Sequence, residues 1–486
     1  MLRLILTGLT CHDMPGHGVP HPVDRSGLLA FPGQPALLGN ADIRGRLLGY
    51  AMAHLEESIG RNLRSAGHSI LTGFGRFLDA RKVLRGSISK ESRQGLDWLN
   101  FFLADIQTGF GAFVAFYLAD LGWDKGEVGL ALFVGTVAGL IAHLPGGALV
   151  DWVPWKRGLA AIGIVTIATS ALILALAPTF VLVFIAEILH GITGGIVTPA
   201  IAAISLGLVG RSAMSARTGR NNAFDAAGNA LTAGAMGVAG QYISKSAIFF
   251  GAAALCLPAL VALSFIRGDE INYARARNAG LGKSATNFQR IFDLSKNVGL
   301  YVFAGCIFLF QLADASMLPV IGEDLALNKS KSASLLMAGL IVTPQIIAAV
   351  LSPWVGYNSE KFGRKPLLLI GFGVEALRGL LFAFFTGYPA LLIGQCLGGI
   401  SAAAVTVITV LMIADMTTGT GRFNLVQGFI GTIIAIAAGT STGVSGFVFE
   451  RVGHWSGFVI LSTAALAATV LLWMGLTETK PGKYID

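Results

Sequence analysis

Charged side chains are scarce in this sequence. Asp, Glu, Lys and Arg make up 13% of its 486 residues, against roughly 25% in ordinary globular domains. A chain of this length with so little charge cannot cover its surface with ionised groups, which excludes a soluble fold. A glycine-rich phosphate loop ending in Lys and Ser or Thr is also missing, so nothing indicates ATP hydrolysis. No nucleophile–base pair is apparent, and we expect the protein not to be an enzyme.

Cysteine is equally sparse, with four residues scattered along the chain at positions 11, 256, 306 and 396. This spacing fits neither a disulfide framework nor a metal site. Five of the eight histidines fall within the first 95 residues, but their spacing matches no ligand pattern. We therefore predict neither a metal nor a cofactor.

Apolar residues, in contrast, make up 54% of the chain. From Leu96 onward they form repeated runs of the about 20 residues that a membrane-spanning helix needs. The runs are continuous, whereas strands of an outer-membrane barrel alternate apolar and polar residues. The sequence predicts an all-α membrane protein with twelve transmembrane helices near 97–121, 127–150, 158–178, 179–208, 221–243, 246–266, 298–321, 333–356, 366–386, 389–414, 424–448 and 455–476.

The basic residues of the loops predict the orientation. With the N-terminus in the cytoplasm, and leaving out residues 1–95, the cytoplasmic loops and tail hold 17 Lys and Arg and the outside loops hold five. This bias places both termini on the cytoplasmic side of the cell (inner) membrane. Because the positive charge follows the loops, the net charge of +8 indicates contact with the lipid bilayer and no nucleic acid.

The predicted organisation has two six-helix bundles and an extension. The extension has no spanning run, and we expect either amphipathic helices on the membrane surface or a disordered tail. The predicted segments are the cytoplasmic extension 1–95, the first bundle 96–266, a cytoplasmic linker 267–297, the second bundle 298–476 and a cytoplasmic tail 477–486.

The two bundles carry signs of an internal duplication. Leu103-Ala104-Asp105 in the first predicted helix recurs 209 positions later as Leu312-Ala313-Asp314. Gly147 and Asp151 recur at the same offset as Gly356 and Glu360. Features that share one offset in equivalent places predict a parallel repeat with pseudo-symmetric halves.

A motif lies between the second and third helices of each half. In the second half it runs from Gly356 through Glu360, Lys361 and Gly363 to Arg364 and Lys365, and it resembles the signature of the major facilitator superfamily. The copy in the first half keeps the glycine, the acid and two late bases. It carries Trp152, Pro154 and Trp155 where a base, glycine and base are usual. The candidate gating residues are Gly147, Asp151, Lys156, Arg157, Gly356, Glu360, Lys361, Gly363, Arg364 and Lys365.

Each retained part of the motif has a physical reason. Glycine lets neighbouring helices approach closely. The acid can lie against the positive N-terminus of a helix in the opposite bundle, and the bases hold the loop at the anionic leaflet. The resemblance covers about 390 residues. It implies a monomeric secondary transporter that rocks two bundles about a central site for a small solute.

Charged and polar residues inside the predicted spans are the candidate coupling and substrate groups, since such groups usually face a cavity. In the family's fold the first and seventh helices line the cavity, which points to Asp105, Gln107, Gln311 and Asp314. Glu187 and His190 share one face of the fourth helix and could relay protons or join helices. Family exporters have an arginine where this chain has Glu187, although Gly191 is kept. The last candidate is Asp225, which lies near Asn222 and Asn229. Its alternative role is structural, as a polar contact that joins helices.

The spans also hold charges with structural interpretations. Glu375 and Arg378 stand three residues apart in the ninth helix, and we expect them to neutralise each other. His143, just before Pro145, is left undecided between structure and site.

These residues lead to one main functional hypothesis and two rivals. The main hypothesis is proton-coupled efflux of a small solute. The first rival is proton-coupled uptake by a permease. The second belongs to another class, a membrane sensor or scaffold that transports nothing and uses the N-terminal extension as its output domain.

Overall fold

The computed structural model describes residues 88–108, 114–115, 117–118, 120–279, 297–321, 333–385 and 387–481. The chain divides into two compact units, Met1–Gly67 and His68–Asp486. All the described residues belong to the second unit. Most of the predicted extension, residues 1–87, lies outside the described residues, so its amphipathic or disordered character remains a prediction.

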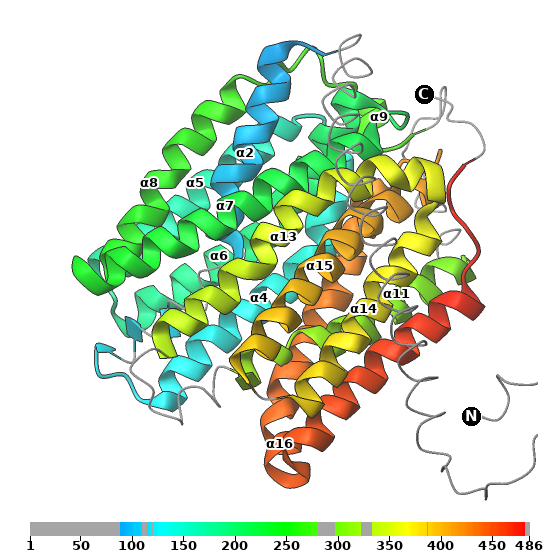
Figure 1. Ribbon diagram of the computed structural model, residues 1–486. Coiled ribbons are helices and arrows are strands. Elements are labelled where there is room, and N and C mark those ends of the chain that lie inside the picture. The colour runs from blue at the N-terminus through cyan, green and yellow to red at the C-terminus, as the bar shows by residue number, and fades with distance from the viewer. Residues whose placement is uncertain are drawn as a thin grey trace, which may run out of the picture. The chain divides into compact units, whose positions relative to one another are not determined.

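The second unit consists of long helices in two halves (Figure 1). The first half contains α2 (Lys90–Thr108), α4 (Lys125–Trp152), α5 (Lys156–Leu176), α6 (Phe180–Val209), α7 (Met214–Tyr242) and α8 (Ala247–Ser264). The second half contains α11 (Val298–Asp314), α13 (Ala333–Phe362), α14 (Arg364–Phe384), α15 (Tyr388–Met416) and α16 (Phe423–Gly475), and a short helix, α9 (Tyr273–Ala276), lies between the halves. Apart from isolated bridges of Ala279, the described residues form no strand. The predicted all-α class is confirmed.

Nine helices in the described part of the chain are long and apolar enough to cross a membrane. The last of these, α16, is two helices joined at Gly453, whose φ of 80° and ψ of 170° are not helical. This backbone conformation is essentially restricted to glycine, and it falls between the predicted spans 424–448 and 455–476. With α16 counted as two helices, these correspond to ten of the twelve predicted spans, and the more polar α2 and α7 overlap the other two.

Some helix ends agree with the sequence and others do not. The predicted boundary between the spans 158–178 and 179–208 is present, with α5 ending at Leu176 and α6 beginning at Phe180. The predicted starts of the first and fifth spans, residues 97 and 221, are wrong, because α2 begins at Lys90 and α7 at Met214. Both helices begin with turns that are richer in polar residues than the apolar windows that follow, and an apolar-run criterion cannot detect such turns.

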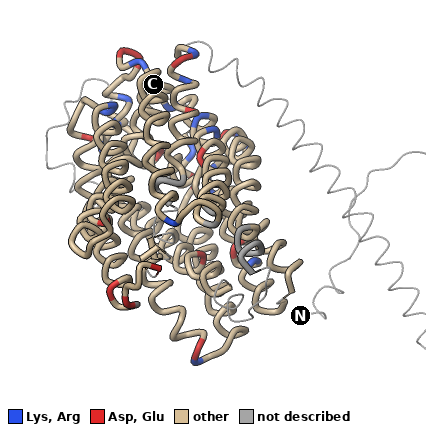
Figure 2. Tube along the Cα trace, turned by 90° about the vertical axis from the view of Figure 1, so that its left-hand side faces the viewer, with Lys and Arg blue, Asp and Glu red and all other residues tan. Residues whose placement is uncertain are grey.

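The helices of each half pack mainly on one another, and two pairs make the most extensive contacts between the halves. α4 contacts α6 and α2 contacts α7 in the first half, while α11 contacts α16 and α13 contacts α15 in the second. Across the halves, α7 packs on α13 and α4 packs on α16. Lys and Arg gather toward one end of the bundle, the upper end in Figure 2.

The described part of the linker, residues 267–279, touches both halves. The Asn272 backbone N–H donates to the carbonyl of Gly207 at the end of α6. Asn278, at a φ of 58°, donates from its side-chain amide to the carbonyl of Ala414 at 2.6 Å. Its carbonyl accepts from Gly421, and the carbonyl of Arg277 accepts from Phe423. This segment thus runs from the end of α6 to the loop between α15 and α16.

Candidate functional site

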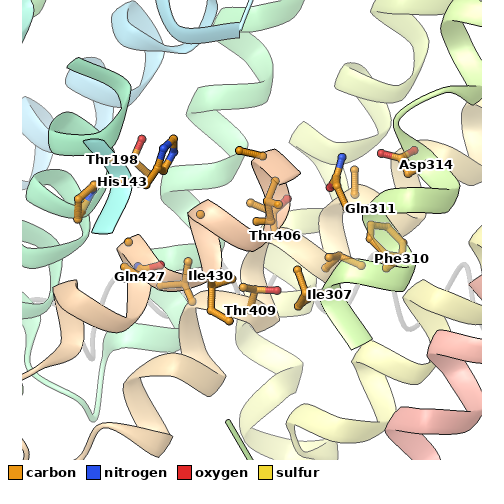
Figure 3. Close-up of a pocket in the computed structure, with 18 of the residues that line it drawn as sticks. His143, Thr198, Ile307, Phe310, Gln311, Asp314, Thr406, Thr409, Gln427 and Ile430 are labelled. Atoms are coloured by element: carbon orange, nitrogen blue, oxygen red, sulfur yellow. The ribbon is translucent and has the colours of Figure 1, made fainter. Parts of the chain in front are cut away.

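A cavity of about 400 Å³ lies between the two halves. Its walls come from α4 and α6 of the first half and from α11, α14, α15 and α16 of the second. Figure 3 shows His143 and Thr198 on one side and Gln311 and Asp314 on the other, with Thr406 between them. The remaining lining is mostly apolar. Such a concave apolar site with a few convergent polar groups is typical of small-molecule binding.

A second cavity of about 250 Å³ adjoins the first. The two share Thr198, Thr406, Val410 and Gln427 in their linings, so they form two lobes of one central site. The smaller lobe is more polar. Its further lining residues include Asn100, Thr218, Asn221, Asn222 and Asp225.

Arg378 of α14 lies behind the larger lobe and binds two carboxylates. One guanidinium nitrogen, Nη1, donates to Asp314 at 2.7 Å and to Glu375 at 2.8 Å. The other terminal nitrogen donates to the Gln395 side-chain oxygen at 3.3 Å. The predicted pair of Glu375 and Arg378 is therefore present, with Asp314 as a third member that their local spacing does not reveal.

His143 faces the cavity from α4. Its Nδ1 lies 2.5 Å from the carbonyl oxygen of Gly139. Since a carbonyl only accepts hydrogen bonds, Nδ1 carries the proton, and a neutral ring then leaves Nε2 as an acceptor. The residue left undecided by the sequence thus belongs to the cavity wall.

The predicted cavity residues divide into three groups. Gln311 and Asp314 line the larger lobe and Asp225 lines the smaller. Glu187 and His190 line neither lobe. Glu187 is buried against α4, where a Cβ at Gly135 would meet its carboxylate. The side chains of Asp105 and Gln107 lie outside the described residues.

Asp151 joins the halves at one end of the bundle. Its carboxylate accepts from the backbone N–H of Asn424 at 3.2 Å, from the Asn424 side chain at 2.8 Å and from the backbone N–H of Leu425 at 2.8 Å. These two N–H groups belong to the first turn of α16, where a carboxylate also meets the positive end of the helix dipole. One turn earlier in α4, a Cβ at Gly147 would overlap the Asn424 carbonyl oxygen. The contact has the geometry that the motif predicts, and its gating role remains a prediction.

The second copy of the motif makes the corresponding contact with α7. The Glu360 carboxylate accepts from the Ser215 hydroxyl in the first turn of α7. A Cβ at Gly356 would meet the Gly219 Cα at 3.0 Å, so α7 and α13 approach closely here. We call the end of the bundle where Asp151, Ser215, Glu360 and Asn424 lie the motif end.

The bases of the two copies differ in their partners. Arg364 is buried and binds Glu360 at 2.8 Å and Asp415 at 3.1 Å. Lys156 is buried and donates to the carbonyls of Val150 and Val153, at the C-terminus of α4. The other bases lie outward, with Arg157 donating to the Ser264 carbonyl at 3.5 Å, Lys361 over the Phe362 ring and Lys365 donating to the Trp473 carbonyl at 2.7 Å.

Gly363 is the N-cap residue of α14, with a φ of 94° and a ψ of 173°. The Glu478 carboxylate, beyond α16, accepts from the backbone N–H of Arg364 at 2.8 Å and of Lys365 at 3.1 Å. It therefore caps the start of α14 just where the motif needs a glycine.

We expect Gly363→Ala to lower stability by about 1–3 kcal/mol, because only glycine readily adopts this conformation and a Cβ would also collide with Glu478. Thermal unfolding of the purified protein measures the effect. Gly373→Ala, in the same helix with open space around its Cα, is the matched control. Equal melting temperatures for the two variants would contradict the prediction.

The sequence did not reveal three groups at the motif end. Asp97 of α2 binds Arg217 at 2.5 Å and Arg220 at 2.6 Å, both from α7. Asp415 binds Arg364 and Arg211, and Glu478 caps α14. Their partners are far away in the sequence, so no local spacing indicates them. Within the described ranges, no group of three or more His, Cys, Asp or Glu side chains could hold a metal ion.

Comparisons with known proteins agree with this architecture. A family model described as Major Facilitator Superfamily matches residues 98–344 and 303–485. An MFS-type transporter of Mycobacterium tuberculosis is 33% identical over 389 residues, which cover 79% of this chain and 93% of that protein. The class B tetracycline resistance protein of Escherichia coli is 28% identical over 29% of this chain and 34% of its own. A human organic anion transporter has a similar fold, with a TM-score of 0.59 and 17% identity over 79% of this chain and all of that one.

Proposed function

Since this chain belongs to the major facilitator superfamily of transporters, we propose that it is a secondary active transporter that moves a small solute across the cytoplasmic membrane by alternating access. The observation that carries the proposal is the cavity between the halves, together with the contacts that join the halves at the motif end. Transport of this kind needs two states of one site whose populations can be shifted.

The distribution of close contacts supports one of these states. At the motif end α4 meets α16 and α7 meets α13 at glycines. Elsewhere in the same helices, a Cβ at Gly234 of α7 or Gly439 of α16 would meet no described atom within 4 Å. We propose that the motif end is cytoplasmic, as the loop charges predict, and that the protein is here closed toward the cytoplasm. Asp151 and Glu360 then act as gate residues, and both termini lie in the cytoplasm of a monomer.

Protons are the coupling ion that we propose. Asp225 lines the smaller lobe and contacts the Asn229 amide at 3.3 Å. No described Lys or Arg forms an ion pair with it, so it can gain or release a proton without breaking one. Carboxylates at membrane depth commonly mark proton pathways. Asp105, whose triplet repeats in α11, is the second candidate.

Liposomes containing the purified protein test the coupling. We expect an imposed pH gradient to drive movement of at least one solute from a panel of cationic, neutral and anionic compounds. Asp225→Asn should reduce this movement to the level measured without a gradient, while exchange of solute at equal pH persists. Asp120→Asn, which removes an exposed carboxylate paired with Lys245, is the matched control. Solute movement that ignores the gradient in the wild type would rule out proton coupling.

Export is the direction that we propose. The tetracycline resistance protein and the multidrug resistance protein 1 of Bacillus subtilis match parts of the chain at 28% identity, and they supply the support for this direction. Accumulation in intact cells tests it, since deletion of the gene should raise the internal level of an exported solute. A fall in that level would favour uptake.

A further inference from the structure

The ionisable side chains that line the central site are almost all acids. Asp314 and Glu375 line the larger lobe and Asp225 lines the smaller. The described lining includes His143 and no Lys or Arg. A site walled by low-dielectric groups and carrying carboxylates attracts positive charge and repels negative charge.

One of these acids is available to a ligand. Of the Asp314 side chain 38% is exposed, against 1% for Glu375 and 5% for Arg378. Asp314 is the last residue of α11, and Figure 3 shows its carboxylate at one side of the pocket beside Gln311. A ligand in the larger lobe can therefore reach Asp314 and cannot reach Arg378.

The charges around Arg378 do not balance. One guanidinium binds the carboxylates of both Asp314 and Glu375, so the ionised trio has an excess of one negative charge. The guanidinium is buried, and a buried charge left without a partner is costly. Glu375 still pairs with the Arg378 guanidinium when Asp314 pairs with a ligand. Asp314 can therefore exchange its contact with Arg378 for one with a cation.

The rest of the larger lobe is apolar. Ile307, Phe310, Val405, Ile430 and Ile434 line it. Phe310 is an aromatic side chain one turn before Asp314 on α11, and aromatic faces attract cations. A ligand that fits this lobe therefore has a largely apolar surface and a single positive charge.

We propose that the central site binds an amphipathic organic cation whose positive charge pairs with Asp314, and that Arg378 and Glu375 are positioning residues. Arg378 favours the ionised form of Asp314, and Glu375 neutralises Arg378 and so leaves Asp314 free to pair with the ligand. The proposal rests on the proposed transport function and names the substrate class of the same cavity.

Equilibrium binding of radiolabelled tetraphenylphosphonium to the purified protein in lipid nanodiscs tests it without any gradient. We expect saturable binding by the wild type and a loss of about tenfold or more in affinity for Asp314→Asn, equivalent to about 1.4 kcal/mol. Asp314→Glu keeps the charge and should restore most of the affinity. Asp120→Asn, which removes a carboxylate that lines neither lobe, should bind as the wild type does.

Two further measurements separate charge from fold. Triphenylphosphine oxide has similar rings and no net charge, so its binding should be equal in the wild type and Asp314→Asn. Glu375→Gln leaves Arg378 to neutralise Asp314 alone and should also weaken phosphonium binding. If Asp314→Asn does not fold, the phosphonium affinity of Glu375→Gln decides the test.

No saturable phosphonium binding by the wild type, or equal affinity in the wild type and Asp314→Asn, would overturn the proposal. A protein that moves neutral or anionic solutes under a pH gradient but does not bind phosphonium refutes the cation site and leaves the transport function standing. Phosphonium binding without gradient-driven movement of any solute supports the cation site and refutes the proposed proton-coupled transport.

Discussion

Replacing Gly147 with valine is expected to reduce transport to about a tenth or less. A Cβ at this position would overlap the Asn424 carbonyl of α16, so the valine side chain would hold α4 and α16 apart. Overpacking of this kind costs about 1–3 kcal/mol, which shifts the balance between two states by roughly 5- to 150-fold. The motif end would then rarely close, and a transporter confined to one state cannot complete its cycle.

Two measurements check this result. Solute flux in proteoliposomes reports transport, and maleimide labelling of S352C, in a chain without its native cysteines, reports opening of the motif end. Ser352 of α13 is buried and accepts a hydrogen bond from Asn222 of α7 in the other half, so labelling should rise in the Gly147→Val background. Gly251→Val, in a helix of the same half with no heavy atom within 4 Å of the new Cβ, is the control. Unchanged flux or unlabelled S352C would refute a gating role for this contact.

Asp97→Ala is expected to be the most destabilising of the variants considered. The Asp97 side chain binds Arg217 at 2.5 Å and Arg220 at 2.6 Å, with Asp97 and Arg217 almost fully buried. Removing the carboxylate leaves the Arg217 guanidinium buried without its anionic partner, which costs about 3–5 kcal/mol. Thermal unfolding of the purified protein should show a large fall in melting temperature.

The expected loss of stability comes from the unpaired charge of Arg217, and a second substitution tests this cause. Asp97→Ala combined with Arg217→Met removes both charges and should recover part of the loss, because buried ion pairs can often be replaced by apolar groups at small cost. Asp120→Ala breaks the exposed pair with Lys245 and should cost about 1 kcal/mol or less. A melting temperature for Asp97→Ala equal to that of Asp120→Ala would contradict the prediction.

The sequence predicted the features of the fold that depend on local pattern. Apolar runs of spanning length predicted the helices, and the repeated glycine and acid predicted the two halves. The motif also predicted a carboxylate at a helix N-terminus of the opposite half, where Asp151 lies against α16. Each of these follows from spacing along one segment.

Contacts between distant helices could not be predicted in this way. The spacing of Glu375 and Arg378 predicts their pairing on α14, but only the packing of α11 beside α14 brings Asp314 to the same guanidinium. Asp97 and Arg217 meet for the same reason, through α2 and α7. Glu187 is the opposite case, since its polar character suggested the cavity, whereas packing buries it between α4 and α6.

The segment between the halves limits how the motif end can open. Asn272 is bonded to the end of α6, while Ala276, Arg277 and Asn278 are bonded to residues 414–424. Separation of the halves must break one of these two sets of bonds. The second set has more bonds, so residues 276–279 should travel with the second half and the bond of Asn272 should break first. We therefore expect opening of the motif end to free the start of this segment from α6, while residues 276–278 keep their bonds to the loop before α16.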